Sequence, residues 1–453
     1  MPLARWLCVA IGVLCIFVPW ATVPPLSFAI SLVLTALTGL LIWSLGRAHG
    51  PTVDTKLLVG LMALGSGFGV LATCTLLIAQ DANVVVAAVF TAGLAVLGLR
   101  SILAPTPPAP LSIALLVSAY ILMMVVAVSV WGVHIDVESF VRGALDALGA
   151  GRSPYNITIE NLYTPEQTPL YYGPDVVAEG RVVYGFPYLP AVLLLDLPAH
   201  LLADAVWMHL ALLLVALGLA WRLTTDQLGR AAVVTLALSP TMPVLIVNYW
   251  IEPVLIGLVA LTVWGLARGR SWAIVVGLGL LFSSKQYALF FLPAVWPVLR
   301  RAGFRCVLVA GVVAAVILAA FVVLDPGAFY RSAVELQFKQ PFRDDAVSFL
   351  PALRAAVGDF PSWMLAVLPF GGFVVSGIVA LRTSPGPTAF ALCVGLGLLA
   401  SVVLSKVGFV NYFMLIGAAL LLAGITWPID DPIQTREPLS QGSRGSRGMS
   451  KTR

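Results

Sequence analysis

Long apolar runs separated by short polar connections fill most of the chain and predict membrane-spanning helices. A helix needs about 20 apolar residues to cross a hydrocarbon core about 30 Å thick. We therefore expect an all-α polytopic membrane protein. About fourteen spans are predicted, at roughly 5–22, 26–46, 57–79, 83–104, 111–133, 205–222, 231–248, 253–267, 272–283, 286–299, 306–324, 362–381, 386–405 and 408–427.

One apolar stretch, residues 187–202, is too short to be counted as a span. Pro187, Pro190 and Pro198 interrupt it. A broken segment is tolerated in a membrane where protein surrounds it, and a short one can lie in the interface. We expect this stretch to lie in the interface or to re-enter instead of crossing.

Basic residues predict the orientation of the spans, because connections on the cytoplasmic side collect Lys and Arg. With the N-terminus inside, the two longest connections, about 134–186 and 325–361, face the extracytoplasmic side. The second loop is itself basic and departs from the rule, although long loops translocate regardless of charge. The inner side receives Arg47, Lys56, Arg100, Arg222, Arg230, Arg268, Arg270, Arg300, Arg301, Arg305, Arg382 and the tail.

The first outer loop opens with a predicted amphipathic helix over residues 136–149. Apolar residues repeat at intervals of three and four from Val137 to Leu148, and charged residues take the other face. Asp136 stands at an N-cap-like position at the start of this helix. An aspartate there is either a helix cap or an acid kept for chemistry, and the pattern alone supports both interpretations.

The composition agrees with a membrane protein, since 60% of the residues are hydrophobic and only 10% are charged. The net charge is +5, and five of the basic residues lie in residues 430–453, which we expect to form a disordered cytoplasmic tail. Basic residues beside a membrane indicate topology and not nucleic-acid binding. The five cysteines occur singly and the histidines lack the spacing of a metal site. We therefore expect neither a disulfide framework nor a metal ion.

Two lysines occur in stretches that are otherwise nearly free of charge. Lys285 and Lys406 each lie at the predicted outer end of a helix. An ionisable residue kept at such a place is a candidate for a functional site, here for binding an anion. The alternative is a long side chain that reaches toward water from the end of a helix.

The order of several short motifs resembles that of GT-C glycosyltransferases, especially glycosyltransferase family 87. The resemblance covers about 111–427, so residues 1–104 would form an additional four-helix membrane module and 105–429 a GT-C-like helical bundle. Many members have a Gly-Gln pair where this chain has residues 248–252. The matching motifs are Asp136-Val-Glu-Ser-Phe140, Ser153-Pro154-Tyr155, Tyr184-Gly-Phe-Pro187-Tyr-Leu-Pro190, Leu238-Ser239-Pro240, Ser284-Lys285-Gln286 and Asn411-Tyr412-Phe413.

The resemblance implies an inverting membrane glycosyltransferase that takes a sugar, with mannose as the expected one, from a polyprenyl-phosphate donor. The acceptor would be a lipid-linked or cell-envelope glycan on the extracytoplasmic face of the plasma membrane, and no cofactor is implied. In the superfamily an acidic residue early in the first outer loop is the catalytic base, and this role falls on Asp136. The candidates for binding the donor phosphate are Lys285, Lys406 and Arg331. The candidates for binding the acceptor or the sugar are Glu138, Tyr155, Tyr188, Glu252, Gln286, Asn411 and Tyr412.

Two other classes of protein stay open at this point. A transporter or lipid flippase commonly shows an internal repeat and places ionisable residues near the bilayer midplane. We find no evident repeat, and the charges gather toward one face. A non-catalytic membrane assembly subunit would keep the fold without the activity.

Overall fold

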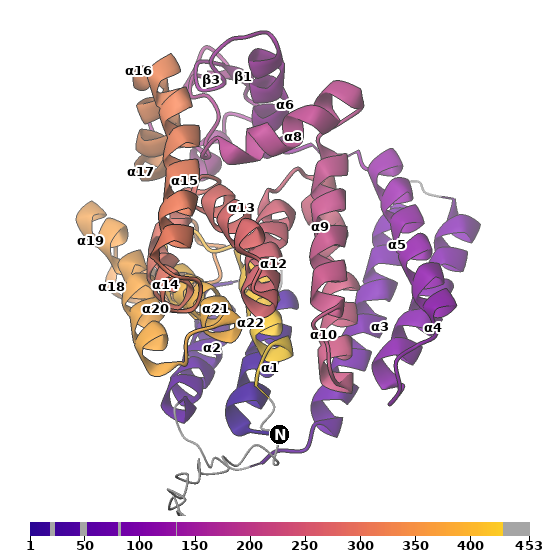
Figure 1. The fold of residues 1–453 in the computed structure, drawn as a ribbon. Coiled ribbons are helices and arrows are strands. Elements are labelled where there is room, and N and C mark those ends of the chain that lie inside the picture. The colour runs from indigo at the N-terminus through magenta and orange to yellow at the C-terminus, as the bar shows by residue number, and fades with distance from the viewer. Residues whose placement is uncertain (19–22, 46–51, 80–82, 133, 429–453) are drawn as a thin grey trace, which may run out of the picture.

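A computed structural model describes residues 1–18, 23–45, 52–79, 83–132 and 134–428 of the protein. The chain is mostly helical, as the apolar pattern predicts (Figure 1). Most of the helices form one bundle, and a smaller group of elements covers one end of it. The predicted tail 430–453 lies outside the described residues.

The bundle combines long helices with several short ones. Its helices up to residue 237 are α1 (Leu3–Ile16), α2 (Pro24–Ser44), α3 (Lys56–Ala79), α4 (Val84–Leu103), α5 (Pro110–Val130), α9 (Val206–Trp221) and α10 (Gln227–Ala237). Those after it are α11 (Thr241–Val247), α12 (Glu252–Arg268), α13 (Ser271–Phe282), η1 (Gln286–Ala294), α14 (Val295–Ala302), α15 (Phe304–Leu324), α18 (Leu350–Val357), α19 (Ser362–Val367), η3 (Leu368–Phe370), α20 (Gly371–Arg382), α21 (Pro387–Val403) and α22 (Val410–Ile425).

The end of the bundle is covered by elements that we call the cap (Figure 1). It contains α6 (Asp136–Gly149), α7 (Thr168–Tyr171), α8 (Ala191–Leu202), α16 (Pro326–Phe329), the π-helical turn η2 (Tyr330–Glu335) and α17 (Leu336–Lys339). Its small antiparallel sheet has the order β1 (Ile159–Glu160), β3 (Arg181–Val182), β2 (Val177–Ala178). The first predicted loop and residues 326–339 of the second thus meet in the cap, whereas α18 of the second loop lies with the bundle. The predicted helix over 136–149 is confirmed.

Five segments are long and apolar enough to cross a membrane, namely α2, α3, α5, α15 and Ser362–Arg382. The number rises to seven if the bent pairs α8–α9 and α10–α11 each count as one span. Several other predicted spans correspond to shorter apolar helices, including α1, α13, α21 and α22. The count of fourteen spans stays a prediction.

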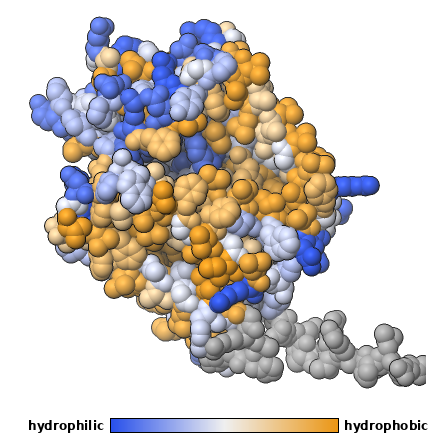
Figure 2. Space-filling view, turned by 90° about the vertical axis from the view of Figure 1, so that its left-hand side faces the viewer, coloured by the Kyte–Doolittle hydropathy of each residue, from blue (hydrophilic) through white to orange (hydrophobic). Residues whose placement is uncertain are grey.

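Apolar side chains cover the sides of the bundle. Leu64 on α3 is 73% exposed and Val316 on α15 is 63% exposed. Figure 2 shows hydrophobic residues over the side of the bundle and hydrophilic ones gathered over the cap. Exposed apolar surface of this extent is typical of a protein that meets lipid. Together with the apolar helices it indicates a multi-pass membrane protein, whereas the membrane and the orientation of the chain stay predictions.

The helices α8 and α9 meet at a sharp angle. They are bent by 118° relative to each other, and Pro198 lies inside α8. A buried hydrogen bond bridges the bend, with His209 Nε2 3.0 Å from Asp196 Oδ2. The stretch predicted to lie in the interface or to re-enter therefore does not extend α9 as a straight span.

The helices α1 and α22 cross closely in the centre of the bundle. A Cβ atom on Gly417 would lie 2.4 Å from a side-chain carbon of Ile16 and 2.9 Å from the carbonyl oxygen of Gly12. Only glycine permits this approach, as is common where membrane helices pack tightly. Residues 1–104, predicted as an additional module, thus contribute their first helix to the core.

Local sequence signals set the start and end of α12, which carries a candidate residue at its first position. Pro253 occupies the first turn after Glu252, where its fixed φ fits a helix and its missing N–H is no loss. The helix ends at Gly269, whose φ of 64° is left-handed. Glu252 thereby stands at the cap-side end of a buried helix.

Candidate functional site

Asp136 is the first residue of α6, and a tyrosine from the sheet region holds its carboxylate. The N-cap of α6 is Ile135, which has no capping side chain. The predicted N-cap position of Asp136 is therefore wrong by one residue. Its Oδ2 accepts a hydrogen bond of 2.8 Å from the Tyr172 hydroxyl. The side chain is thus engaged by groups of the cap that come from far along the chain.

Aromatic rings and one guanidinium surround this carboxylate. Tyr163 and Tyr172 lie side by side, with ring centroids 5.6 Å apart. Tyr163 also stacks on Tyr171, at 3.9 Å between centroids. On the other side of Tyr171, the Arg343 guanidinium lies 4.7 Å from its ring centroid. Residues of both large polar loops, 134–186 and 325–361, therefore surround Asp136.

The surroundings of Asp136 make its carboxylate more basic than usual. Burial raises the pKa of Asp136, while the Tyr172 hydroxyl, the Val137 N–H, Tyr163 and Arg343 each lower it in part. The balance leaves the pKa above that of an ordinary aspartate. A carboxylate of raised pKa that is still held by donors is suited to accept a proton.

We expect Tyr172→Phe to raise the pKa of Asp136 further, because it removes a hydrogen bond to the charged form. If Asp136 must be ionised for activity, the acidic limb of the pH–rate profile should move to higher pH, by up to about one unit for one lost hydrogen bond. The measurement is the rate of the reaction proposed below as a function of pH.

Tyr171→Phe is the matched control for this change. Tyr171 stacks on Tyr163 and on Arg343, but no hydrogen bond joins it to Asp136. The acidic limb of the pH–rate profile of Tyr171→Phe should stay at the pH found for the wild type. If the acidic limb shifts equally in Tyr171→Phe and Tyr172→Phe, the hydrogen bond from Tyr172 does not determine the pKa of Asp136.

A cavity of about 630 Å³ opens next to this region. Its walls come from η1, α17, α19, η3, α21 and the connection between α21 and α22. Much of the wall is apolar, with side chains such as Phe290, Trp363 and Phe370. Five residues predicted for the site line this cavity: Tyr188, Lys285, Gln286, Lys406 and Tyr412. An apolar chamber with a polar end fits an amphipathic ligand.

Lys285 is neutralised by a carboxylate inside the protein. Its Nζ lies 2.6 Å from Glu252 Oε1, and both side chains are buried. The rings of Tyr188, Tyr287 and Tyr412 surround the ammonium group, with centroids 4.7–4.9 Å away. This cage of cation–π contacts and the ion pair hold Lys285 in place. The pairing of the two predicted residues with each other was not foreseen from the sequence.

Lys406 keeps its positive charge uncompensated at the wall of the cavity. Its Nζ donates to the carbonyl oxygens of Phe338, at 3.3 Å, and of Gln340. Within the described part of the chain, no carboxylate lies in ion-pair distance of this nitrogen. Lys406 is therefore better placed than Lys285 to bind an added anion.

Asp136 is not part of the cavity wall, but it lies beside it. Its charge interacts with Tyr188, which lines the cavity. A second connection runs through Arg343, whose backbone N–H donates to the carbonyl oxygen of Lys406 at 3.2 Å. The acid and the two lysines predicted from separate parts of the sequence are thus brought to adjacent places.

Two other candidates, Glu138 and Tyr155, make contacts that hold the cap together. Glu138 pairs with Arg142 at 3.0 Å, and its Oε2 lies 2.6 Å from His134 Nδ1. Tyr155 is fully buried, and its hydroxyl donates to the Tyr188 carbonyl oxygen at 3.0 Å. This burial favours a packing role over a contact with sugar.

The remaining candidates divide between the cavity and its surroundings. Gln286 donates to the carbonyl oxygens of Pro187 and Ala333, at 2.9 and 2.6 Å. Asn411 is buried, and its Oδ1 has no hydrogen-bond partner among the described residues. Arg331 is outside the cavity wall and donates to Asn156 Oδ1 at 3.4 Å. Arg331 is thus directed to a different part of the cap.

Arg343, Tyr163 and Tyr172 are the site residues that sequence reasoning did not select. The signals were present, because the second loop is unusually basic and the first is rich in tyrosine. Spacing does not show which arginine or tyrosine turns toward Asp136, since the two loops are about 200 residues apart in sequence. Only the packing of the loops in the cap selects them.

The described residues include no group of three His, Cys, Asp or Glu side chains placed to hold a metal ion. Comparisons of the chain with protein-family models, with curated proteins and with solved structures found no match.

Proposed function

We propose that this protein is an inverting membrane glycosyltransferase with Asp136 as its general base. It transfers a sugar, mannose by our expectation, from a polyprenyl-phosphate donor to a lipid-linked or cell-envelope glycan on the extracytoplasmic face of the plasma membrane. The observation that carries the proposal is the position of Asp136, with its raised pKa, beside a largely apolar cavity that has Lys406 at its wall.

The parts of such a donor correspond to the parts of the site. The apolar wall suits the prenyl chain, and Lys406 suits the phosphate, because a cation in a partly dry site stabilises the charge that develops there. The rings of Tyr188 and Tyr412 offer faces against which a sugar can pack. Each of these groups would act without moving the buried pair of Lys285 and Glu252.

The reaction needs one proton transfer and one displacement. The acceptor hydroxyl oxygen forms a bond to the anomeric carbon while the bond from that carbon to the phosphate oxygen breaks. Asp136 takes the hydroxyl proton, and polyprenyl phosphate leaves with the bonding electrons. Attack from the side opposite the leaving group inverts the configuration, so a single carboxylate is sufficient.

The experiment that tests the proposal uses the purified full chain in proteoliposomes with polyprenyl phosphates that carry labelled mannose, glucose or arabinose. We expect label to appear in an acceptor glycan or glycolipid. Movement of labelled donor between leaflets without any new glycosidic bond would replace the proposal with transport. Neither transfer nor movement would favour a non-catalytic assembly subunit.

We expect Lys406→Gln to weaken donor binding and to raise the KM for the donor about tenfold or more, as the loss of one charge-assisted hydrogen bond would. The acceptor KM should change less. Lys339→Gln is the control, because Lys339 pairs with Glu335 at 3.5 Å and does not line the cavity. Equal donor KM values for Lys406→Gln and the wild type would exclude Lys406 from the phosphate site.

A second candidate function, transport of a lipid or another amphipathic substrate, is favoured by one observation. The buried pair of Glu252 and Lys285 joins two places where helices start or break, before α12 and before η1. Transporters place ionisable residues at such interruptions. The proteoliposome experiment separates the two functions, because only transfer makes a new covalent bond.

A further inference from the structure

A second cavity lies on the cap, away from Asp136. Its volume is about 330 Å³, which is at the small end of the usual range for ligand sites. It forms where the C-terminal end of α6 and the segment that follows it meet the junction of α15 and α16. Ala147 in its wall is eleven residues from Asp136 on the same helix, which corresponds to about 16 Å.

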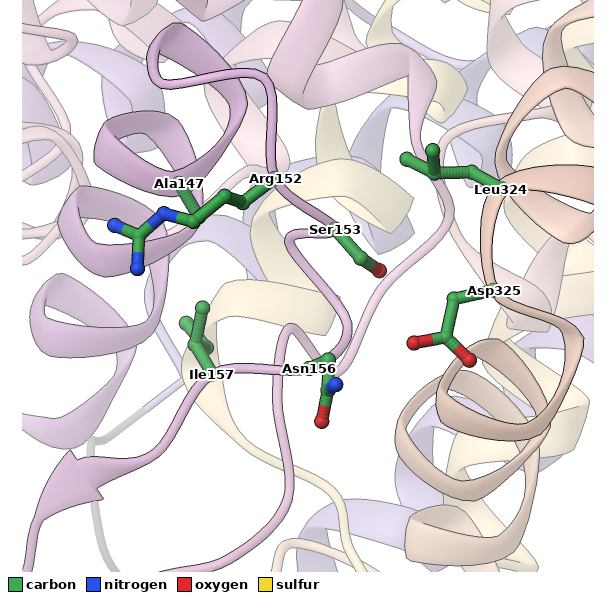
Figure 3. A pocket seen from close by; sticks show the side chains of 7 residues that line it. All are labelled: Ala147, Arg152, Ser153, Asn156, Ile157, Leu324 and Asp325. Carbon is green, nitrogen blue, oxygen red and sulfur yellow. The ribbon is translucent and has the colours of Figure 1, made fainter.

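The polar groups of this cavity come from both of its sides (Figure 3). Asp325 directs its carboxylate toward Ser153 and Asn156, while the Arg152 guanidinium lies beyond them, beside Ile157. Ala147, Ile157 and Leu324 supply the apolar part of the wall. The lining therefore offers a cation, an anion, an amide and a hydroxyl within one small space.

Most of these polar groups have bonding capacity left over. The Ser153 hydroxyl is buried and has no hydrogen-bond partner among the described residues. Asp325 uses Oδ1 to cap α16, at 3.0 Å from the Ala328 N–H, which leaves Oδ2 uncommitted within that part of the chain. Asn156 accepts from Arg331 but donates its own N–H groups to none of the described residues. Arg152 and Asn156 are exposed and Asp325 is half-buried, so their free groups stand at the open side of the cavity, while the Ser153 hydroxyl lies deeper. A buried hydroxyl without a protein partner is uncommon and is satisfied by a water molecule or a ligand.

We propose that this cavity binds a neutral carbohydrate unit. Arg152 and Asp325 carry opposite charges. A charged ligand would therefore be attracted by one of these side chains and repelled by the other. A sugar hydroxyl both donates and accepts, and can bond to a carboxylate, a guanidinium, an amide and a hydroxyl in turn. The apolar residues match the C–H face of a pyranose ring.

The position of the cavity limits where the carbohydrate comes from. Leu324 is the last residue of α15, a helix long and apolar enough to span a membrane, and it is 53% exposed. The cavity is therefore at the level where the membrane surface would lie. Both a glycolipid headgroup and a free glycan reach this level and offer the same hydroxyl chemistry. The site is distinct from the proposed transfer reaction, and binding to it does not require that reaction.

The test is saturation-transfer NMR on the full chain in nanodiscs, with soluble mannotriose and maltotriose as probes and inorganic phosphate as an anionic comparison. We expect a trisaccharide to bind. Arg152→Ala and Asp325→Asn should each weaken its binding about tenfold, as expected for one hydrogen bond to a charged group. Asn at 325 keeps an oxygen for the Ala328 N–H, so α16 should stay folded. Vesicles that carry a mannosylated lipid, compared with the free trisaccharide, show which source binds more tightly.

The controls separate this inference from the proposed function. Asp136→Asn should bind the trisaccharide as the wild type does, whatever its effect on transfer. Arg270→Ala removes an exposed arginine outside the cavity and should also leave binding unchanged. The inference is overturned if neither trisaccharide nor glycolipid binds, if Arg152→Ala and Asp325→Asn bind as tightly as the wild type, or if phosphate is preferred over the sugars.

Discussion

Asp136→Asn is expected to lower the rate of sugar transfer by about 10²- to 10⁴-fold, which is the usual contribution of a positioned general base. Asparagine has nearly the same shape and can still accept the hydrogen bond from Tyr172. It does not take a proton from an acceptor hydroxyl. The loss should therefore appear in kcat, with smaller changes in the KM for the donor, in assays with labelled polyprenyl-phosphate sugar.

Glu138→Gln is the matched control for this variant. Glu138 is on the same helix and loses the same charge, but its carboxylate pairs with Arg142 and His134 and not with Tyr172. We expect most of the transfer activity to remain in Glu138→Gln. A wild-type rate in Asp136→Asn would falsify the assignment of the base, and equal losses in both variants would point to a general effect of charge on α6.

Lys285→Met should lower the free energy of unfolding by about 3–5 kcal/mol, because it leaves the buried carboxylate of Glu252 without its cation. Tyr287 donates to the same Oε1 at 3.3 Å, while Oε2 has no hydrogen-bond partner among the described residues. An unpaired charge there has little to compensate it. The measurement is denaturant unfolding of the purified chain in detergent, followed by tryptophan fluorescence.

The double variant Glu252→Gln with Lys285→Met shows whether the pair itself matters for stability. Removing both charges avoids the unpaired carboxylate, so we expect it to recover most of the stability lost in Lys285→Met. Such a recovery would identify the loss as the cost of an uncompensated buried charge. A double variant as unstable as Lys285→Met would show that packing around Lys285, and not charge, explains the loss.

The helix α6 and the two large polar segments follow from local patterns in the sequence. The amphipathic period from Val137 to Leu148 is set by residues close together in the sequence, so it predicts the helix correctly. Only the N-cap differs, since it is Ile135 and not Asp136. The two outer loops follow from their length and polarity. Their union in one cap is consistent with the orientation that basic residues predict.

Other features depend on contacts between distant residues and were not predictable in this way. The three short strands of the cap have only two residues each, too few for an alternating pattern. The central position of α1 depends on its fit to α22, far along the chain. For the same reason the sequence marked Lys285 and Glu252 separately as candidates but not as partners.

The candidate site shows the same division. Lys285, Gln286, Lys406, Tyr188 and Tyr412 were selected by motif and by isolated charge, and all five line one cavity. Local sequence does not reveal which of the two lysines, Lys285 or Lys406, has no carboxylate beside it. The folded chain brings Glu252 next to Lys285, whereas no carboxylate of the described residues lies next to Lys406.

The close crossing of α1 and α22 bears on the order in which the protein is assembled. The ribosome makes α1 about 400 residues before α22, at about 5–20 residues per second, and the groove that receives α1 is completed only when α22 follows. During that interval of about 20–80 seconds, α1 lacks the helix that completes its groove. The packing of α1 in the centre of the bundle therefore waits for a helix that is made much later in the chain.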